Sequence, residues 1–364
     1  MTTPEQEQLE SIRQRIDALD EKILALISER ARCAEKVAQI KLNAGGEQAH
    51  FYRPEREAQV LRTVKERNQG PLSDAEMARL FREIMSACLA LEQPLRVAYL
   101  GPDGSYTHAA ALKHFGGSVQ TEAAEGIDGV FRLVEVGSAD FGVVPVENST
   151  EGVVGQTLDL LLRSPLTIGG EVQLPVHHNL ISACSDLAGV ETVYGHQQAL
   201  AQCRKWLDNH LPGVERLAVS SNSRAVTLCK EKTNCGAIAG KMASELYGVP
   251  ILAANIEDEP NNTTRFLVVG KLQSKPSGED KTSLLVSTRN QPGALARLLE
   301  PLARRGISMS KIESRPSRQG IWEYVFYIDI SGHGEDKDVA EALGEIARHA
   351  AMIKVLGSYP RFVI

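Results

Sequence analysis

Two cations interrupt an otherwise apolar helical face near the N-terminus. Apolar residues recur at steps of three and four from Leu9 to Ile40, and Arg30 occupies a position that this heptad pattern reserves for an apolar side chain. At about 100° per residue, Lys41 falls almost on the face of Arg30, and Arg13 lies about a quarter turn away from it. A buried guanidinium is costly unless it is paired. The pattern has two interpretations: Arg30 sets the register of a helical pair, or Arg30 and Lys41 bind a small dianion.

Polar loops beside strand-like segments form a second group of residues that could do chemistry. Their sequences are GPDGSYTHAA (101–110), PVENSTEG (145–152), GHQQALAQC (195–203), SSNSRAV (220–226) and NNTTRF (261–266). Taken singly, most of these loops are better explained as helix caps or turns. Several of them converging at the ends of strands would make an anion-binding crevice. Neither the Walker nor the Rossmann glycine pattern occurs, so no nucleotide cofactor is expected.

The elements that must position these residues differ along the chain, as the spacing of the apolar residues indicates. Residues 5–92 have a helical apolar period. From residue 95 to 272 short strand-like segments alternate with helical stretches, which predicts α/β structure large enough for two lobes. After a linker by composition at 273–280, residues 282–358 fit a βαββαβ order of the ferredoxin-like kind. We therefore expect three domains, at 1–93, 95–272 and 281–364.

Composition and charge exclude several classes of protein. The chain has 364 residues, a net charge of −6 and a pI near 5.9, so a nucleic-acid binder is not expected. No apolar run is long enough to span a membrane, and the polar N-terminus lacks the apolar core of a signal peptide. The His177-His178 doublet is interpreted as a neutral structural pair. We expect a cytoplasmic protein without a metal, with its scattered cysteines reduced: Cys33, Cys88, Cys184, Cys203, Cys229 and Cys235.

Residues 5–93 resemble the AroQ-type chorismate mutases, which are all-helical. The resemblance is carried by LESIRQRIDALDEKILALISERARCAEKVAQIK (9–41) and YRPEREAQVL (52–61). It implies that Arg13 of a partner chain, two residues of the third helix, and Arg30, Lys41, Arg56 and Glu57 surround chorismate. The arginines would bind its two carboxylates bidentately. Because the reaction is a pericyclic rearrangement, the protein need only hold the compact conformer and stabilise charge at the ether oxygen.

Three residues depart from the pattern of that family. Arg53 stands where the best-known members have Asp, Cys88 where a third-helix Ser is usual, and Glu92 where Gln donates to the ether oxygen. A carboxyl group can donate a hydrogen bond only when it is protonated. We therefore predict that mutase activity falls toward alkaline pH and that Glu92→Gln flattens this fall in a pH–rate profile. An unchanged profile would contradict this role, and Glu92 would then be a solvated helix end.

The middle segment resembles the prephenate dehydratase domain over roughly residues 95–272. The resemblance is carried by GPDGSYTHAA, PVENSTEG, NNTTRF and the pair Gln202-Cys203. It implies two α/β lobes similar to type II periplasmic binding proteins, with the site between them. The implied catalytic residues are Asn148, Gln202 and Thr264, with Glu147, Ser149, Ser223 and Arg265 nearby. Gly195 stands where many members have Ser, so a substrate contact from that serine would be missing.

The chemistry that the resemblance implies is mild, since aromatisation drives the loss of the ring hydroxyl and the carboxylate of prephenate. Thr264 would donate a hydrogen bond to the leaving oxygen. Its hydroxyl is too weak an acid to act alone, so a relay or a neutral carboxyl group such as Glu147 remains open. Arg265 would anchor the pyruvyl carboxylate; the alternative is a salt bridge at the end of the strand.

The C-terminal segment resembles the ACT regulatory domain, in the form fused to prephenate dehydratases. The sequence NQPGALARLLEPLARRGISMSKIESRP (290–316) carries the resemblance. Without it, a tight turn and a charged strand end would explain the same residues. The resemblance implies a phenylalanine site at a dimer interface, built from Asn290, Gly293, Ala294, Leu295 and the ESRP stretch with Glu313, Ser314 and Arg315. Glycine there would let the backbone of a ligand approach the start of the helix.

The order of the three segments resembles the bifunctional chorismate mutase/prephenate dehydratase family of phenylalanine biosynthesis. It implies the substrates chorismate and prephenate, the effector L-phenylalanine, no cofactor and a homo-oligomer of at least two chains. Two alternatives remain open. The dehydratase could prefer arogenate, or the chain could be a non-catalytic amino-acid sensor.

Overall fold

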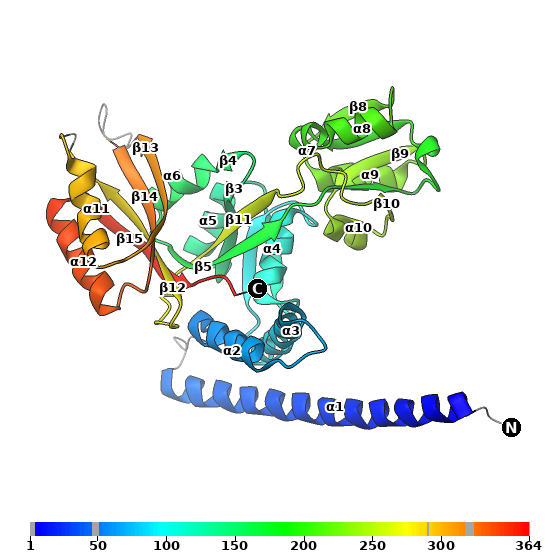
Figure 1. The fold of residues 1–364 in the computed structure, drawn as a ribbon, viewed down its shortest axis with the longest axis horizontal. Coiled ribbons are helices and arrows are strands. Elements are labelled where there is room, and N and C mark those ends of the chain that lie inside the picture. Colours follow the sequence, from blue (N-terminus) through cyan, green and yellow to red (C-terminus); the bar gives the residue numbers. More distant parts are fainter. Residues whose placement is uncertain (1–3, 46–50, 290, 317–323, 364) are drawn as a thin grey trace.

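The computed structural model describes residues 4–45, 51–289, 291–316 and 324–363. It has a helical N-terminal part, a two-lobed α/β part and a C-terminal part with one antiparallel sheet (Figure 1). The fold class predicted for each segment is therefore confirmed.

The helical part consists of α1 (Pro4–Gly45), α2 (Pro54–Arg67) and α3 (Asp74–Glu92). Pro54 lies in the first turn of α2, where its missing N–H has no helical partner to lose. Ser73 caps α3, because its Oγ accepts a hydrogen bond from the backbone N–H of Glu76 at 3.2 Å. These signals explain where the second and third helices begin.

The long helix α1 extends well beyond α2 and α3 (Figure 1). Its C-terminal part packs against α3, and Ala38 is buried there. The apolar seam of its N-terminal half is 47–65% exposed at Leu9, Ile12, Ile16, Leu19, Ile23 and Leu26. So long an apolar stripe on the surface is typical of an interface with another chain.

The first lobe holds a sheet in the order β2-β1-β3-β11-β5, with the short β4 beside β3. Strand β11 returns from the second lobe and lies antiparallel between β3 and β5. The strands are β1 (Arg96–Leu100), β2 (Gln120–Ala124), β3 (Phe141–Asn148), β4 (Gly152–Val153), β5 (Thr167–Pro175) and β11 (Thr263–Gly270). The helices are α4 (Tyr106–Phe115), α5 (Ile127–Glu135) and α6 (Gly155–Arg163).

The second lobe holds a sheet in the order β10-β6-β9-β7-β8. Two segments, 176–178 and 254–262, connect it to the first lobe. They pair with each other, since the N–H of Ile256 donates to the carbonyl of His178 at 2.7 Å. The strands are β6 (Asn179–Ser182), β7 (Thr192–His196), β8 (Glu215–Val219), β9 (Cys235–Ala239) and β10 (Ile251–Ala253). The helices are α7 (Gln197–Gln202), α8 (Arg204–His210), α9 (Asn222–Glu231), α10 (Lys241–Tyr247) and a 3₁₀ turn at Leu187–Gly189.

The C-terminal part has the predicted βαββαβ order. Its elements are β12 (Asp280–Ser287), α11 (Ala294–Arg304), β13 (Met309–Pro316), β14 (Tyr324–Ser331), α12 (Lys337–His349) and β15 (Met352–Pro360). The two helices cover one face of the sheet β13-β14-β12-β15. Its other face packs on the first lobe, where Leu285, Tyr327 and Leu356 share a core with Val144 and Leu158. The first lobe and the C-terminal sheet therefore meet through apolar side chains.

The segment expected to be a linker is anchored to the helical part. Arg62 of α2 donates hydrogen bonds to the carbonyls of Ser277, at 3.0 Å, and Glu279, at 2.8 Å. Ser274 and Ser277 are buried. A composition rich in Ser, Pro and Gly thus indicated irregular structure correctly. The packing of this segment, however, depends on a side chain more than 200 residues away in the sequence.

Candidate active sites

Thr264 and Asn148 face each other at the ends of two neighbouring strands. In the antiparallel register of β3 and β11, Thr264 lies opposite Asn148, and opposite residues project from the same face of a sheet. The Nδ2 of Asn148 donates to Thr264 Oγ1 at 2.8 Å and to the Oδ1 of Asn262 at 2.7 Å. Two residues predicted to be catalytic are thus in direct contact.

The hydrogen bonds of Asn148 determine what Thr264 can do. The Oδ1 of Asn148 accepts the backbone N–H groups of Thr150 and Glu151, both at 3.0 Å. Because that oxygen is occupied by donors, the amide nitrogen must be the atom that faces Thr264. The threonine oxygen then accepts this bond, and its own proton is free to be donated elsewhere. This is the arrangement that a donor to a leaving hydroxyl needs.

Gln202, at the end of α7 in the second lobe, reaches the same group. Its Oε1 lies 2.8 Å from His178 Nε2 and 3.4 Å from Asn262 Nδ2. Its Nε2 donates to the Oε1 of Glu151, in the first lobe, at 3.2 Å. The structure therefore brings together Asn148, Thr264 and Gln202 from the two lobes. Glu151, Asn262 and His178 also belong to this group and were missed from the sequence.

The two predicted serines lie in different surroundings. Ser149 is occupied by the backbone of the polar run, since its Oγ accepts the N–H of Thr263 at 2.9 Å and lies 3.3 Å from the carbonyl of Asn261. Ser223, at the start of α9, is buried, and its Oγ makes no hydrogen bond within the described residues. It approaches Gly104 of the first lobe, where an added Cβ would lie 3.4 Å from Oγ. Ser149 shapes the turn, whereas Ser223 keeps a free polar atom between the lobes.

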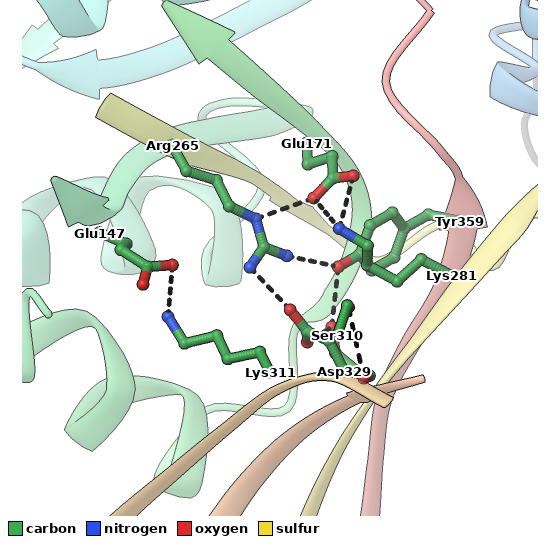
Figure 2. Close-up of polar contacts among 9 residues, drawn as sticks. Glu147, Glu171, Arg265, Lys281, Ser310, Lys311, Asp329 and Tyr359 are labelled. Atoms are coloured by element: carbon green, nitrogen blue, oxygen red, sulfur yellow. Dashed lines mark hydrogen bonds and ion pairs between the residues drawn. The ribbon is translucent and has the colours of Figure 1, made fainter. Parts of the chain in front are cut away.

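Glu147 and Arg265 lie on the opposite face of the same two strands. They are paired in the register, and a β-bulge follows between Arg265 and Phe266. The Oε2 of Glu147 lies 2.7 Å from the Nζ of Lys311, in the C-terminal part (Figure 2). Since neighbouring residues on a strand alternate between faces, neither side chain points toward Thr264. The structure does not bring Glu147 or Arg265 into the group around Asn148.

Each of the three nitrogens of the Arg265 guanidinium takes part in a network of polar contacts (Figure 2). Its Nε lies 2.8 Å from Glu171 Oε2, its Nη1 lies 2.6 Å from Asp329 Oδ2 and its Nη2 lies 3.2 Å from Tyr359 Oη. Lys281 also contacts Glu171, at 2.7 Å. Burial, with the carboxylates of Asp329 and Glu171, raises the pKa of Tyr359 well above its ordinary value. The expectation that Arg265 anchors a substrate carboxylate is therefore corrected to its alternative, a buried salt bridge at the strand end.

A second candidate site is a cavity of about 470 Å³ in the helical part. Seven of the eight residues predicted to bind chorismate line it: Arg30, Lys41, Arg53, Arg56, Glu57, Cys88 and Glu92. The eighth, Arg13, is exposed on the free part of α1 and does not line the cavity. The cavity wall is thus strongly cationic, as a dianion requires.

Two ion pairs organise this cavity. The Nζ of Lys41 lies 3.5 Å from Glu92 Oε2 and donates to the carbonyl of Phe51 at 3.1 Å. Glu57 Oε1 lies 3.2 Å from the Nε of Arg82. Burial raises the pKa of Glu57, and the positive charge of Arg82 opposes this rise. Arg82 was missed from the sequence because its partners, Glu57 and the carbonyl of Lys113 in α4 at 2.7 Å, come from other elements.

The predicted effector residues lie on two elements of the C-terminal part. Gly293 has φ = 76° at the start of α11, a conformation that favours glycine; Ala294 and Leu295 follow it in the first turn. Asn290 lies outside the described residues. Glu313, Ser314 and Arg315 are on β13, and Arg315 Nε lies 3.2 Å from Asp159 Oδ1 of α6. Arg315 is thus also a contact with the first lobe.

Two further features are absent from the part of the chain that the structure covers. No group of three or more His, Cys, Asp and Glu side chains there could hold a metal ion. None of the helices described above is long and apolar enough to cross a membrane.

Comparison with known families agrees with the three parts of the structure. The family described as chorismate mutase type II matches residues 12–93, prephenate dehydratase matches residues 97–274, and the ACT domain matches residues 282–348.

Two relatives and one solved structure are similar over long stretches. Proteins named bifunctional chorismate mutase/prephenate dehydratase from Stutzerimonas stutzeri and Pseudomonas aeruginosa are 56% and 54% identical, over 99% of this chain and 100% of theirs. A prephenate dehydratase of Arthrobacter aurescens in complex with L-Phe is 33% identical, with a TM-score of 0.68, over 73% of this chain and 90% of that one. The chain therefore belongs to the family of bifunctional chorismate mutase/prephenate dehydratases.

Proposed function

We propose that this protein converts chorismate to prephenate in its helical part and prephenate to phenylpyruvate between the two lobes, and that phenylalanine inhibits the second reaction. The observation that carries the proposal is the Asn148–Thr264 pair, which leaves a hydroxyl proton free beside Gln202 of the other lobe. The cationic cavity supports the first reaction. We keep a cytoplasmic location as a prediction from the sequence.

In the first reaction, binding and orientation do most of the work. Arg30, Arg56 and Lys41 hold the two carboxylates of chorismate and favour the compact conformer. Lys41 and Glu92, which are 3.5 Å apart, would be the donors to the ether oxygen, and the carboxyl group of Glu92 donates only in its protonated form. No proton transfer and no covalent intermediate are required.

In the second reaction, prephenate loses carbon dioxide and water and takes up one proton. The C–C bond to the ring carboxylate breaks, its electrons form the aromatic ring, and the ring hydroxyl leaves. Thr264 donates to that hydroxyl, and Asn148 holds Thr264 in the donating orientation. The proton must reach Thr264 through a relay. Glu151, beside Gln202, is the carboxyl group that borders this site, in place of Glu147.

We propose a homo-oligomer of at least two chains. The exposed apolar seam of α1 and the position of Arg13 beside that seam support it, because a partner helix would cover the seam and could bring its own Arg13 to the cavity. The mass of the protein in solution tests this part of the proposal. A mass of two or more chains would support it, and the mass of a single chain would contradict it.

The experiment that tests the function supplies chorismate to the purified protein and follows prephenate and then phenylpyruvate, with and without phenylalanine. We expect both products, and less phenylpyruvate with phenylalanine present. A parallel assay with arogenate tests the alternative substrate. Absence of both products would contradict the proposal and favour the amino-acid sensor.

Phenylalanine inhibition is expected to depend on Lys311. The strand β13 carries Lys311 and, two to four residues later, the predicted effector residues 313–315. Lys311 contacts Glu147, the neighbour of Asn148 on β3. We expect Lys311→Met to raise the half-inhibitory concentration of phenylalanine at least about fivefold, the lower end of typical allosteric couplings, while calorimetry shows that phenylalanine still binds.

Lys354→Met is the matched control for this prediction. Lys354 also joins the C-terminal part to the first lobe, by donating to the carbonyls of Leu161 and Ser164 at 2.9 and 2.6 Å, but it contacts α6 and the residue after it instead of β3. Inhibition should be nearly unchanged in this variant. Equal inhibition of wild type and Lys311→Met would exclude the pair with Glu147 as a route between the two sites.

A further inference from the structure

His178 lies at the junction of the two lobes and contacts Gln202, a residue of the proposed dehydratase site. It is on the first connecting segment and is only 2% exposed. Its imidazole lies between Tyr106 of α4, with Nδ1 3.1 Å from Tyr106 Oη, and Gln202 of α7, with Nε2 2.8 Å from Gln202 Oε1. Tyr106 belongs to the GPDGSYTHAA segment and was assigned no role from the sequence, where His178 was interpreted only as part of a neutral structural pair.

The backbone around His178 leaves its ring little freedom. Its N–H donates to Glu257 Oε2 at 2.8 Å, and its carbonyl accepts the N–H of Ile256 at 2.7 Å. Both contacts come from the second connecting segment. The ring of Tyr106 packs edge-on against the imidazole, with centroids 5.8 Å apart. His178, which is part of the first connection, is therefore held by the second connection and by the first lobe.

The hydrogen bonds around the imidazole are consistent with one tautomer. Burial lowers the pKa of His178, opposed by its bond to Gln202 and by the charge of Glu257, so the ring is neutral near pH 7. Gln202 Nε2 faces the carboxylate of Glu151, so Gln202 must present its oxygen to His178. His178 then carries its proton on Nε2 and donates it to Gln202. Nδ1 then carries no proton and faces the hydroxyl of Tyr106, which also donates to the carbonyl of His177 at 2.8 Å, so these two acceptors share one hydroxyl proton.

We propose that His178, oriented by Tyr106, is a positioning residue that holds the amide of Gln202 in one orientation. In this orientation the NH₂ group of Gln202 faces Glu151, and its carbonyl oxygen faces His178 and Asn262. Without the N–H of His178 the amide could turn over and direct its oxygen toward Glu151 and toward a substrate with two carboxylates. The contact would then be repulsive instead of attractive. This inference rests on the proposed dehydratase activity.

Two isosteric substitutions separate positioning from packing. The amide of Gln can place an N–H where His178 has Nε2, whereas the shorter Asn reproduces only the Nδ1 end next to Tyr106. We expect His178→Asn to lower the kcat of the dehydratase by about tenfold or more, as for the loss of one buried hydrogen bond, with a smaller change in KM. His178→Gln should retain kcat within about threefold, a difference well under that of one buried hydrogen bond.

A double variant and an internal control complete the experiment. If His178 acts through Gln202, His178→Asn combined with Gln202→Ala should be no slower than Gln202→Ala alone. The conversion of chorismate to prephenate by the same chains should be unchanged, which shows that the helical part of each variant is folded, and the activity of His178→Gln shows that the two lobes fold without the imidazole. If wild type itself forms no phenylpyruvate, the proposed function fails and not the role of His178.

Three results would overturn the inference. In the first, His178→Asn is as active as wild type. In the second, the Asn and Gln variants are equally slow while mutase activity is intact. In the third, the effects of His178→Asn and Gln202→Ala multiply. The second would mean that the imidazole only fills space between the lobes, and the third that His178 acts independently of Gln202.

Discussion

Replacing Thr264 with valine is expected to lower the dehydratase kcat by about 10²–10⁴-fold, the usual contribution of a positioned proton donor. Valine has nearly the shape of threonine, so the strand pair β3 and β11 should keep its register. The variant loses the hydroxyl that would donate to the leaving oxygen and leaves one hydrogen bond of Asn148 unmade, although Asn148 keeps its bond to Asn262. Product formation from prephenate is the measurement.

Two substitutions and one internal activity serve as controls for Thr264→Val. Thr264→Ser keeps the hydroxyl and should recover most of the activity. Thr263→Val makes the same chemical change one residue earlier, where the side chain projects to the opposite face of β11, and should have little effect. Mutase activity of Thr264→Val should equal that of wild type, because the cationic cavity lies in the helical part. A Thr264→Val variant within about threefold of wild type would contradict the donor role.

Replacing Arg265 with methionine is expected to destabilise the protein strongly. The substitution removes one partner of a buried ionic network, and Asp329 and Glu171 are 10% and 3% exposed. Breaking a buried pair by removing one partner typically costs about 3–5 kcal/mol, because a buried charge is left uncompensated. Lys281 still contacts Glu171, so most of the loss should fall at Asp329. The unfolding midpoint in urea is the measurement.

Arg204→Met is the control for this second prediction. Arg204 is exposed and lies 3.9 Å from Asp208 on the same helix, an arrangement that contributes little to stability. The urea unfolding midpoint of Arg204→Met should therefore be close to that of wild type. The two possible roles of Arg265 predict different results for Arg265→Met. A carboxylate anchor predicts a large rise in KM for prephenate with normal stability, and this result would contradict the salt-bridge role.

The elements were predictable where the local pattern is strong. The helical period of residues 5–92 and the βαββαβ order of the C-terminal segment have strong signals of their own. The strand β5 was not predicted, and TIGGEVQLP has two glycines that weaken a strand signal. It forms because β11 and the packing of β15 against it support it. Such support comes from residues that are far away in the sequence.

The candidate sites were predictable in part for a related reason. Asn148 and Thr264 belong to sequence motifs, and the register of two strands brings them together. Glu147 and Arg265 belong to the same motifs, yet the alternation along each strand directs them to the C-terminal part (Figure 2). A motif identifies a set of residues but not the side of the sheet on which each side chain lies.

By itself the sequence determined the three parts, their order, the family and most of the residues around the two candidate sites, because residue types and periods are local properties. Only the tertiary structure decided that Arg265 pairs with Asp329 of the C-terminal part, that Arg82 pairs with Glu57 and that His178 contacts Gln202. These contacts join residues from different elements. Their existence depends on the register, on the direction of side chains and on burial, which only the folded chain has.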